Sequence, residues 1–220
     1  MQWLDGFHLY LFDFDGLLVD TEPLHFKAFK QMLAANNCDS QLSYANYLEL
    51  AHANTIDLRD HTYASFNLLY KEKPDWEVLR QEKAIIYLGL LKTEELKLLP
   101  GVEKVLTILE AKGVKRCVVT NSTHEQVQLI QLKLPLLTSI PHWICREDYC
   151  LPKPDPEGYL LAISRLAQPG DRIVGFEDSP KGLKALQEAS VEAVLITTRK
   201  ERAKDCICFD SFEILVDNLC

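Results

Sequence analysis

Two aspartates, Asp13 and Asp15, lie within the otherwise apolar run LYLFDFDGLLVDTEP at positions 9–23. The run before them is typical of a buried strand, where an unpaired carboxylate costs several kcal/mol. Either the strand interpretation is wrong, or the pair belongs to a site built for chemistry. Gly16 follows directly and favours the second interpretation, and backbone N–H groups near it could complete a cradle for an anion.

Further polar side chains occur where later strands are expected to end. The strand-like RCVVT ends in Thr120 and is followed by Asn121 and Ser122, Lys153 lies between prolines in LPKPDP, and Glu177, Asp178 and Ser179 follow RIVGF. Each group has an ordinary alternative, because the first and third could cap helices and the lysine could be a solvated loop residue. Since the groups occur in order, each at a strand end, we favour one shared site.

These residue types together suit phosphate chemistry. Carboxylate oxygens are the ligands that Mg²⁺ prefers, and Asp13, Asp15 and Asp178 could supply them. Lys153 would add positive charge for a phosphate, and the Thr120 hydroxyl would add a donor. Asp13 could attack phosphorus, because an aspartyl phosphate splits hydrolysis into two easier steps. Asp15 could protonate the leaving oxygen and later activate water.

Alternating strands and helices are expected to position these residues. Residues 8–14 are typical of a central strand, and a helix is expected from Pro23. Beyond residue 98, helices are predicted over 102–109, 123–133, 157–167 and 180–189, and strands over 116–120, 141–145, 172–176 and 192–197. This alternation predicts an α/β fold with a Rossmann-like, doubly wound, mostly parallel sheet, in which ligands bind beyond the carboxyl ends of the strands.

Residues 36–97 interrupt that alternation. They contain few glycines and many Leu, Tyr and Ala residues, show no strand pattern, and include a helix start near Asp75. We therefore predict an inserted α-helical lid. The expected division is a core formed by 1–18 and 98–220, with an inserted helical domain at 19–97.

Composition restricts the class of protein. The chain has 220 residues, 47% of them hydrophobic, which fits one sizeable domain or one domain with an insert. The net charge of −8 and the short longest basic stretch, TTRKER, argue against a nucleic-acid partner. No stretch is apolar enough for a membrane span, and MQWLDGFH lacks the features of a signal peptide. We expect a cytoplasmic monomer or weak dimer whose seven cysteines, without zinc-ligand spacing, are mostly core thiols.

The motifs DFDGLLVDTEP, VVTNS, KPDP and GFEDSPKGLKAL together resemble those of the haloacid dehalogenase-like (HAD) superfamily of phosphohydrolases. The similarity covers about 1–35 and 98–198 and is greatest to the branch with a helical cap inserted after the first motif. That branch includes phosphoglycolate phosphatase and β-phosphoglucomutase. The resemblance implies a Rossmann-like core with a cap over the site.

The resemblance also implies roles for individual residues. Asp13 matches the nucleophile and Asp15 the general acid/base. The family's Mg²⁺ ligands correspond here to Asp13, the backbone carbonyl of Asp15, and Asp178. Glu177 matches an acid that usually supports the metal through water. The phosphate binders match Thr120 and Lys153, with Asn121 as a contributing neighbour.

The inserted region matches the family less well. His25 matches a histidine of β-phosphoglucomutase-like members, and the favoured alternative is a surface or hinge histidine on the first helix of the insert. Arg59 is a candidate substrate contact, and the favoured alternative is a solvated helix arginine. The stretch LELAHANTIDLRDH lacks the glycine that many relatives carry there.

From the motifs taken together, we expect a Mg²⁺-dependent phosphatase of small phosphomonoesters, such as phosphoglycolate or sugar phosphates. The alternatives are a phosphomutase, for which His25 is the sequence feature, and a non-enzymatic binding protein on the same scaffold.

Overall fold

A computed structural model of the chain describes residues 6–53, 55–198 and 206–217. Its internal contacts divide the chain into two compact units. One unit combines Met1–Asp20 with Leu96–Cys220, and the other is Thr21–Glu95. Most of the basic stretch TTRKER lies outside the described residues.

The first unit contains a six-stranded sheet in the order β3-β2-β1-β4-β5-β6, and every neighbouring pair is parallel. The strands are β1 (Leu9–Phe12), β2 (Lys115–Val119), β3 (His142–Ile144), β4 (Ile173–Glu177), β5 (Glu192–Ile196) and β6 (Ile207–Phe209). The predicted parallel α/β sheet is therefore confirmed. The short edge strand β6 was not predicted.

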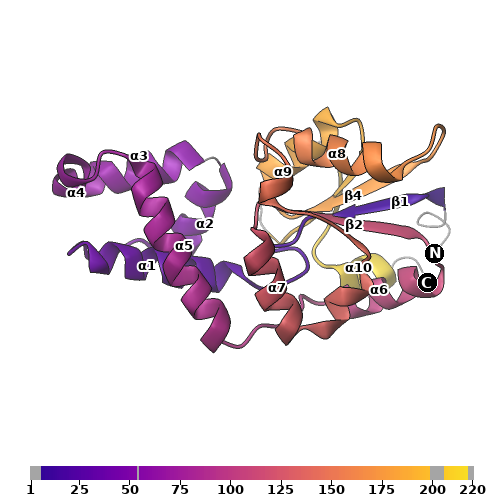
Figure 1. The fold of residues 1–220 in the computed structure, drawn as a ribbon, viewed down its shortest axis with the longest axis horizontal. Helices are drawn as coiled ribbons and strands as arrows, with labels where there is room; N and C mark the ends of the chain where they lie inside the picture. Colours follow the sequence, from indigo (N-terminus) through magenta and orange to yellow (C-terminus); the bar gives the residue numbers. More distant parts are fainter. Residues whose placement is uncertain (1–5, 54, 199–205, 218–220) are drawn as a thin grey trace. The chain divides into compact units, whose positions relative to one another are not determined.

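Helices cover both faces of this sheet (Figure 1). They are α6 (Val102–Ala111), α7 (His124–Lys133), α8 (Glu157–Leu166), α9 (Pro180–Glu188) and α10 (Phe212–Asp217), with short 3-10 helices η2 (Pro135–Ser139) and η3 (Arg146–Asp148). In Figure 1, α8 and α9 lie on one side of the sheet, and α6, α7 and α10 lie on the other. The helices predicted over 102–189 are confirmed to within about two residues at each end, whereas α10 was not predicted.

The central strand β1 is buried along its whole length. Leu9 and Leu11 belong to an apolar cluster on one face, and Phe12 stacks on Phe176 on the other, with ring centroids 5.1 Å apart. A parallel strand covered on both faces reads as a continuous apolar run, which explains why LYLF does not alternate. Phe12 lies opposite Val118 and Phe176, so the residues that follow these three meet at one edge.

The regular elements among the described residues of the second unit are all helices. It comprises α1 (Glu22–Ala35), α2 (Tyr44–Ala53), α3 (Thr55–Ser65), α4 (Asn67–Glu72) and α5 (Trp76–Thr93). Its core includes Phe29, Tyr47 and Leu79. The predicted helix start near Asp75 is confirmed, because its side chain accepts a hydrogen bond from the Glu77 N–H and caps α5.

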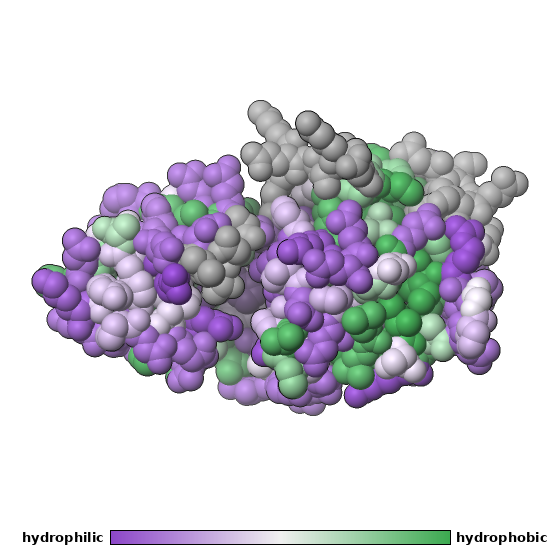
Figure 2. Space-filling view, turned by 90° about the horizontal axis from the view of Figure 1, so that it is seen from above, coloured by the Kyte–Doolittle hydropathy of each residue, from purple (hydrophilic) through white to green (hydrophobic). Residues whose placement is uncertain are grey.

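Hydrophilic side chains dominate the face of the molecule seen in Figure 2, and hydrophobic ones gather on part of the unit that contains the sheet. None of the described helices combines the length and hydropathy that crossing a membrane requires. The described cysteines are all free thiols. Cys117 and Cys145 are buried, as expected of core thiols, whereas Cys150 is exposed.

Candidate active site

Asp13 is the first residue after the central strand. Its backbone N–H continues the ladder by donating to the Phe176 carbonyl at 3.0 Å, and its side chain is buried. Lys153 Nζ lies 2.5 Å from Asp13 Oδ1, although the two residues are 140 positions apart in the chain. The strand interpretation of the LYLFDFDG run is therefore correct, and the buried carboxylate has a cationic partner.

Lys153 is buried at the centre of a compact polar cluster, so the solvated-loop alternative is wrong. Besides Asp13, its ammonium group contacts Glu177 Oε1 and the Val119 carbonyl, each at 2.7 Å, and the Tyr159 hydroxyl at 2.9 Å. Tyr159 in turn donates to Glu177 Oε1 at 2.6 Å. Three N–H groups thus serve four oxygen atoms, which fixes the ammonium group in place.

The charges in this cluster perturb one another. Burial, followed by the charge of Glu177, raises the pKa of Asp13 to about 7, although Lys153 acts in the opposite direction. Burial alone would lower the pKa of Lys153, but the Asp13 and Glu177 carboxylates outweigh it and raise that pKa. Lys153 therefore stays charged, and the surrounding carboxylates outnumber it.

Asp15 lies two residues after Asp13, and two hydroxyl groups hold its carboxylate. Ser122 Oγ donates to Asp15 Oδ2 at 2.6 Å, and Thr120 Oγ1 donates to the same oxygen at 3.3 Å. Thr120 Oγ1 also accepts from the Ser122 N–H at 2.9 Å. Thr120 is not the cap of α7, because Thr123 performs that role. Gly16 has a φ of 78°, which favours glycine, and its N–H donates to the Val19 carbonyl within the turn.

Asn121 links the end of β2 to the loop that carries Lys153. Its Oδ1 accepts from the Lys153 backbone N–H at 3.2 Å and lies 2.7 Å from the Tyr149 hydroxyl. That hydroxyl is also 2.7 Å from the Thr120 carbonyl, and burial raises the pKa of Tyr149 to about 12. Tyr149 is therefore a protonated donor that connects the two segments.

Glu177 ends β4 directly under the start of α9. Ser179 caps this helix by accepting from the Gly182 N–H at 3.2 Å, so the predicted capping alternative holds for Ser179. A Cβ atom on Gly182 would lie 2.0 Å from the Glu177 carboxylate, an approach that only glycine permits. The first turn of α9 therefore closes over Glu177 because residue 182 has no side chain.

The carboxylates form a group that fits a hard cation. Asp13, Glu177 and Asp178 each offer an oxygen within 4.8 Å of the other two, and all three are buried. Lys153 supplies one positive charge against these three acids. An all-carboxylate donor set of this kind suits Mg²⁺, which would offset the excess negative charge.

The two candidate residues of the helical unit have partners within that unit. The His25 ring stacks on Tyr87 with centroids 3.9 Å apart, and its Nδ1 lies 3.4 Å from Lys83 Nζ. Arg59 is partly exposed and pairs with Asp60 at 2.8 Å.

Sequence reasoning named Ser122 only as part of the strand end Thr120-Asn121-Ser122 and assigned it no role, and it did not single out Tyr149 or Tyr159. Ser122 belongs to the quoted stretch VVTNS, so its place at a strand end was a usable signal. Tyr159 lies six residues after Lys153, in the first turn of α8, and its hydroxyl contacts the ammonium group of Lys153. Tyr149 carried no comparable pattern.

Comparison with known proteins places this geometry in context. A family model described as haloacid dehalogenase-like hydrolase matches residues 7–190. A phosphorylated carbohydrates phosphatase of Thermotoga maritima is 27% identical over 190 residues, covering 84% of this chain and 82% of that protein. A probable pseudouridine-5'-phosphatase of Drosophila melanogaster is 30% identical over 195 residues, covering 84% and 80%. The crystal structure of CbbY from Rhodobacter sphaeroides in complex with phosphate is 25% identical, with a TM-score of 0.78 over 95% of this chain and 96% of that one.

Proposed function

The chain belongs to the haloacid dehalogenase-like hydrolase family, and we propose that it is a Mg²⁺-dependent phosphatase of small phosphomonoesters that acts through an aspartyl phosphate on Asp13. The observation that carries this proposal is the buried contact of Asp13 with Lys153, 2.5 Å long, at the end of the central strand. A reactive carboxylate needs a fixed position and a nearby cation, and this contact provides both.

In the first step, an Asp13 carboxylate oxygen attacks the phosphorus of the ester. The new bond joins that oxygen to phosphorus, and the bond from phosphorus to the ester oxygen breaks. Asp15, as the carboxylic acid, gives its proton to the departing oxygen, so the alcohol leaves in neutral form. The hydroxyl groups of Ser122 and Thr120 orient Asp15 for this transfer through their contacts with Oδ2.

In the second step, water attacks the phosphorus of the aspartyl phosphate. Asp15, now a carboxylate, accepts a proton from this water. The bond between phosphorus and Asp13 breaks, which restores the free carboxylate and releases inorganic phosphate. Asp13 must be ionised to begin the cycle, and Lys153 favours that state by its charge and its hydrogen bond.

Mg²⁺ would be held by Asp13, Asp178 and the backbone carbonyl of Asp15, with Glu177 contributing through water. When bound, it supplies positive charge that offsets the carboxylates and the phosphoryl oxygens. Glu177 has a second task, because its Oε1 accepts from both Lys153 and Tyr159 and thereby holds the lysine toward Asp13.

The names of the relatives support the substrate class. The Thermotoga protein is named for phosphorylated carbohydrates, and the Drosophila protein for a nucleoside monophosphate. Both are esters of phosphoric acid with a small alcohol. We therefore propose a phosphorylated small metabolite, such as a sugar phosphate or phosphoglycolate, as the substrate.

The test is phosphate release from a panel of phosphomonoesters with and without Mg²⁺. The panel contains phosphoglycolate, hexose and pentose phosphates, nucleoside monophosphates and an aryl phosphate. Wild type is compared with Asp13→Asn and with Asp39→Asn, which changes an exposed carboxylate of the helical unit and controls for a general effect of an Asp→Asn change. We expect Mg²⁺-dependent release in wild type and Asp39→Asn, and none in Asp13→Asn.

Two outcomes would contradict the proposal. Equal release by Asp13→Asn would rule out the covalent mechanism. Absence of release from every ester, followed by turnover once a sugar bisphosphate is added, would indicate the phosphomutase alternative instead.

A further inference from the structure

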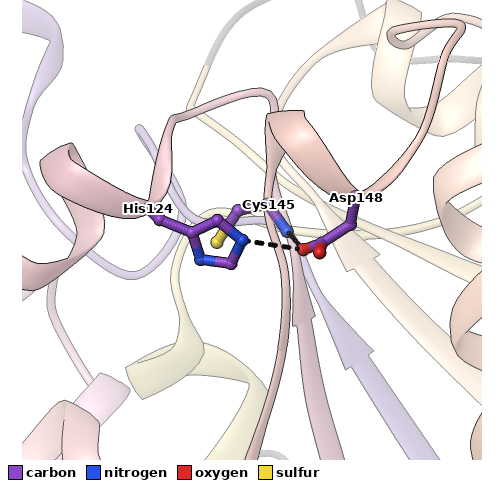
Figure 3. A group of neighbouring side chains, drawn as sticks. All are labelled: His124, Cys145 and Asp148. Carbon is purple, nitrogen blue, oxygen red and sulfur yellow. Dashed lines mark hydrogen bonds and ion pairs between the residues drawn. The ribbon is translucent and has the colours of Figure 1, made fainter.

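Outside the carboxylate cluster, three side chains of different chemistry meet on the unit that contains the sheet. His124 is the first residue of α7, Cys145 directly follows β3, and Asp148 is the last residue of η3. Figure 3 shows the three side chains pointing toward one another. Their nitrogen, sulfur and oxygen atoms all lie within 4.8 Å of one another.

We propose that His124, Cys145 and Asp148 form a binding site for a soft transition-metal ion, with Zn²⁺ as the natural occupant. Thiolate, imidazole and carboxylate are the ligands that zinc takes in proteins, whereas Mg²⁺ avoids sulfur. Three protein ligands leave a fourth tetrahedral position for water or another small ligand. This site differs in residues and in donor chemistry from the all-carboxylate cluster around Asp13.

One of the three distances between ligand atoms already suits a tetrahedral ion, and the two that involve the Cys145 sulfur, which are within 4.8 Å, must shorten by up to about 1.5 Å. Ligand atoms of a tetrahedral zinc ion, at bond lengths of about 2.0 to 2.3 Å, lie roughly 3.3 to 3.8 Å apart. His124 Nε2 already lies 3.2 Å from Asp148 Oδ2. Cys145 is buried and Asp148 is partly buried, so these two side chains would stay in place. The His124 side chain is half-exposed and would move to bind an ion that arrives from solvent.

Neighbouring groups hold the candidate ligands. The Cys145 backbone N–H donates to Asp148 Oδ2 at 2.7 Å, and the His124 backbone N–H donates to the Glu147 carboxylate at 3.1 Å. Burial, followed by the charges of Asp148, Glu147 and Asp15, raises the pKa of the Cys145 thiol to about 12. The same negative field attracts a cation, and metal binding would replace the thiol proton, which passes to solvent.

The site is also linked to the proposed general acid/base. The Arg146 N–H, next to Cys145, donates to the Ser122 carbonyl at 3.0 Å, and Ser122 Oγ donates to Asp15 Oδ2 at 2.6 Å. An ion on Cys145 would therefore act on the position of Asp15 through two hydrogen bonds. We expect Zn²⁺ to inhibit the phosphatase at saturating Mg²⁺, and this consequence rests on the proposed function.

The decisive experiment uses Co²⁺ as a spectroscopic probe on the full chain with saturating Mg²⁺ present. Cobalt bound to a thiolate shows a sulfur-to-metal charge-transfer absorption that carboxylate-bound cobalt cannot give. We expect this absorption to saturate at one Co²⁺ per chain and to disappear when Zn²⁺ is added. Cys145→Ser should abolish it, whereas Cys150→Ser, which changes the exposed thiol of the same loop, should leave it intact.

A second pair of variants covers the case in which Cys145→Ser does not fold. His124→Gln changes a half-exposed side chain and should weaken cobalt binding by about tenfold or more, because even residues behind the ligands of metal sites contribute about 10–100-fold. His142→Gln changes an exposed histidine of β3 and should bind as wild type does. Circular dichroism confirms that each variant is folded.

Two results would overturn the site: no charge-transfer absorption in wild type, or an absorption that survives both Cys145→Ser and His124→Gln. Inhibition is measured separately with the best ester. Zn²⁺ should inhibit wild type and His142→Gln alike, and His124→Gln should require about tenfold more Zn²⁺ or more. Equal inhibition of all three would refute the link to Asp15, while the cobalt absorption tests the site itself whether or not the chain is a phosphatase.

Discussion

Replacing Gly182 by alanine tests how the active-site cluster is held together. The new Cβ atom would lie 2.0 Å from the Glu177 carboxylate, and ordinary contact begins at 3.4 Å, so these atoms must separate by about 1.4 Å. Glu177 accepts from Lys153 at 2.7 Å and from Tyr159 at 2.6 Å. A shift of that size breaks at least one of these bonds.

The expected cost follows from those contacts. A hydrogen bond to a charged group contributes about 1.5–3 kcal/mol, and overpacking a core costs about 1–3 kcal/mol. The usual gain from replacing a helical glycine by alanine, about 0.5–1 kcal/mol, offsets a part. We therefore expect Gly182→Ala to lower the free energy of unfolding of the sheet-containing unit by about 1.5–5.5 kcal/mol, or its Tm by about 3–22 °C.

Two other glycine-to-alanine changes serve as controls. A Cβ atom on Gly89 in α5 would meet nothing within 4 Å, so Gly89→Ala should keep or slightly raise the Tm. One on Gly158 in α8 would lie 3.0 Å from Val119 Cγ1, and its effect should fall between the other two. Scanning calorimetry measures all three, and phosphate release measures kcat/KM. If Gly182→Ala melted within about 2 °C of wild type and kept full kcat/KM, Glu177 would not be held as described.

Four further predictions use the same assays. Lys153→Met should abolish turnover and cost about 3–5 kcal/mol of stability, because it leaves the Asp13 and Glu177 carboxylates buried without their cation; an unchanged Tm would contradict the buried pair. Asp15→Ala should lower kcat by about 10²–10⁴-fold, and a wild-type rate would exclude its proton-transfer role. Ca²⁺ in place of Mg²⁺ should inhibit, since its larger and looser coordination misplaces the reacting atoms, whereas equal turnover would argue against the oxygen site. Burial raises the pKa of Cys117 to about 12, so this thiol stays protonated and should resist alkylation under conditions that modify exposed Cys150; equal labelling by mass spectrometry would refute this.

The sequence alone was enough for the features that depend on neighbouring residues. Apolar runs and helical periodicity predicted the parallel sheet and its main helices, because a buried strand and an amphipathic helix each leave a local pattern. The same patterns marked where strands end, and parallel strands bring their carboxyl ends to one edge. Asp13, Thr120, Lys153 and Glu177 could therefore be named together before the fold was known. The edge strand β6 has only three residues, too few for such a pattern.

Tertiary structure alone decided which side chains touch. Lys153 and Tyr159 both donate to Glu177, because the strand register and the orientation of α8 bring these side chains together. Register and helix orientation cannot be recognised from a short stretch of sequence. In the sequence, Gly182 has no feature that distinguishes it from other helical glycines. Only the packing of α9 over Glu177 shows that a Cβ atom has no room there. Likewise, His124 and Cys145 lie in segments without zinc-ligand spacing, and only the folding of α7 against the loop after β3 brings them together. Local patterns specify elements, whereas contacts between distant residues follow from how those elements pack.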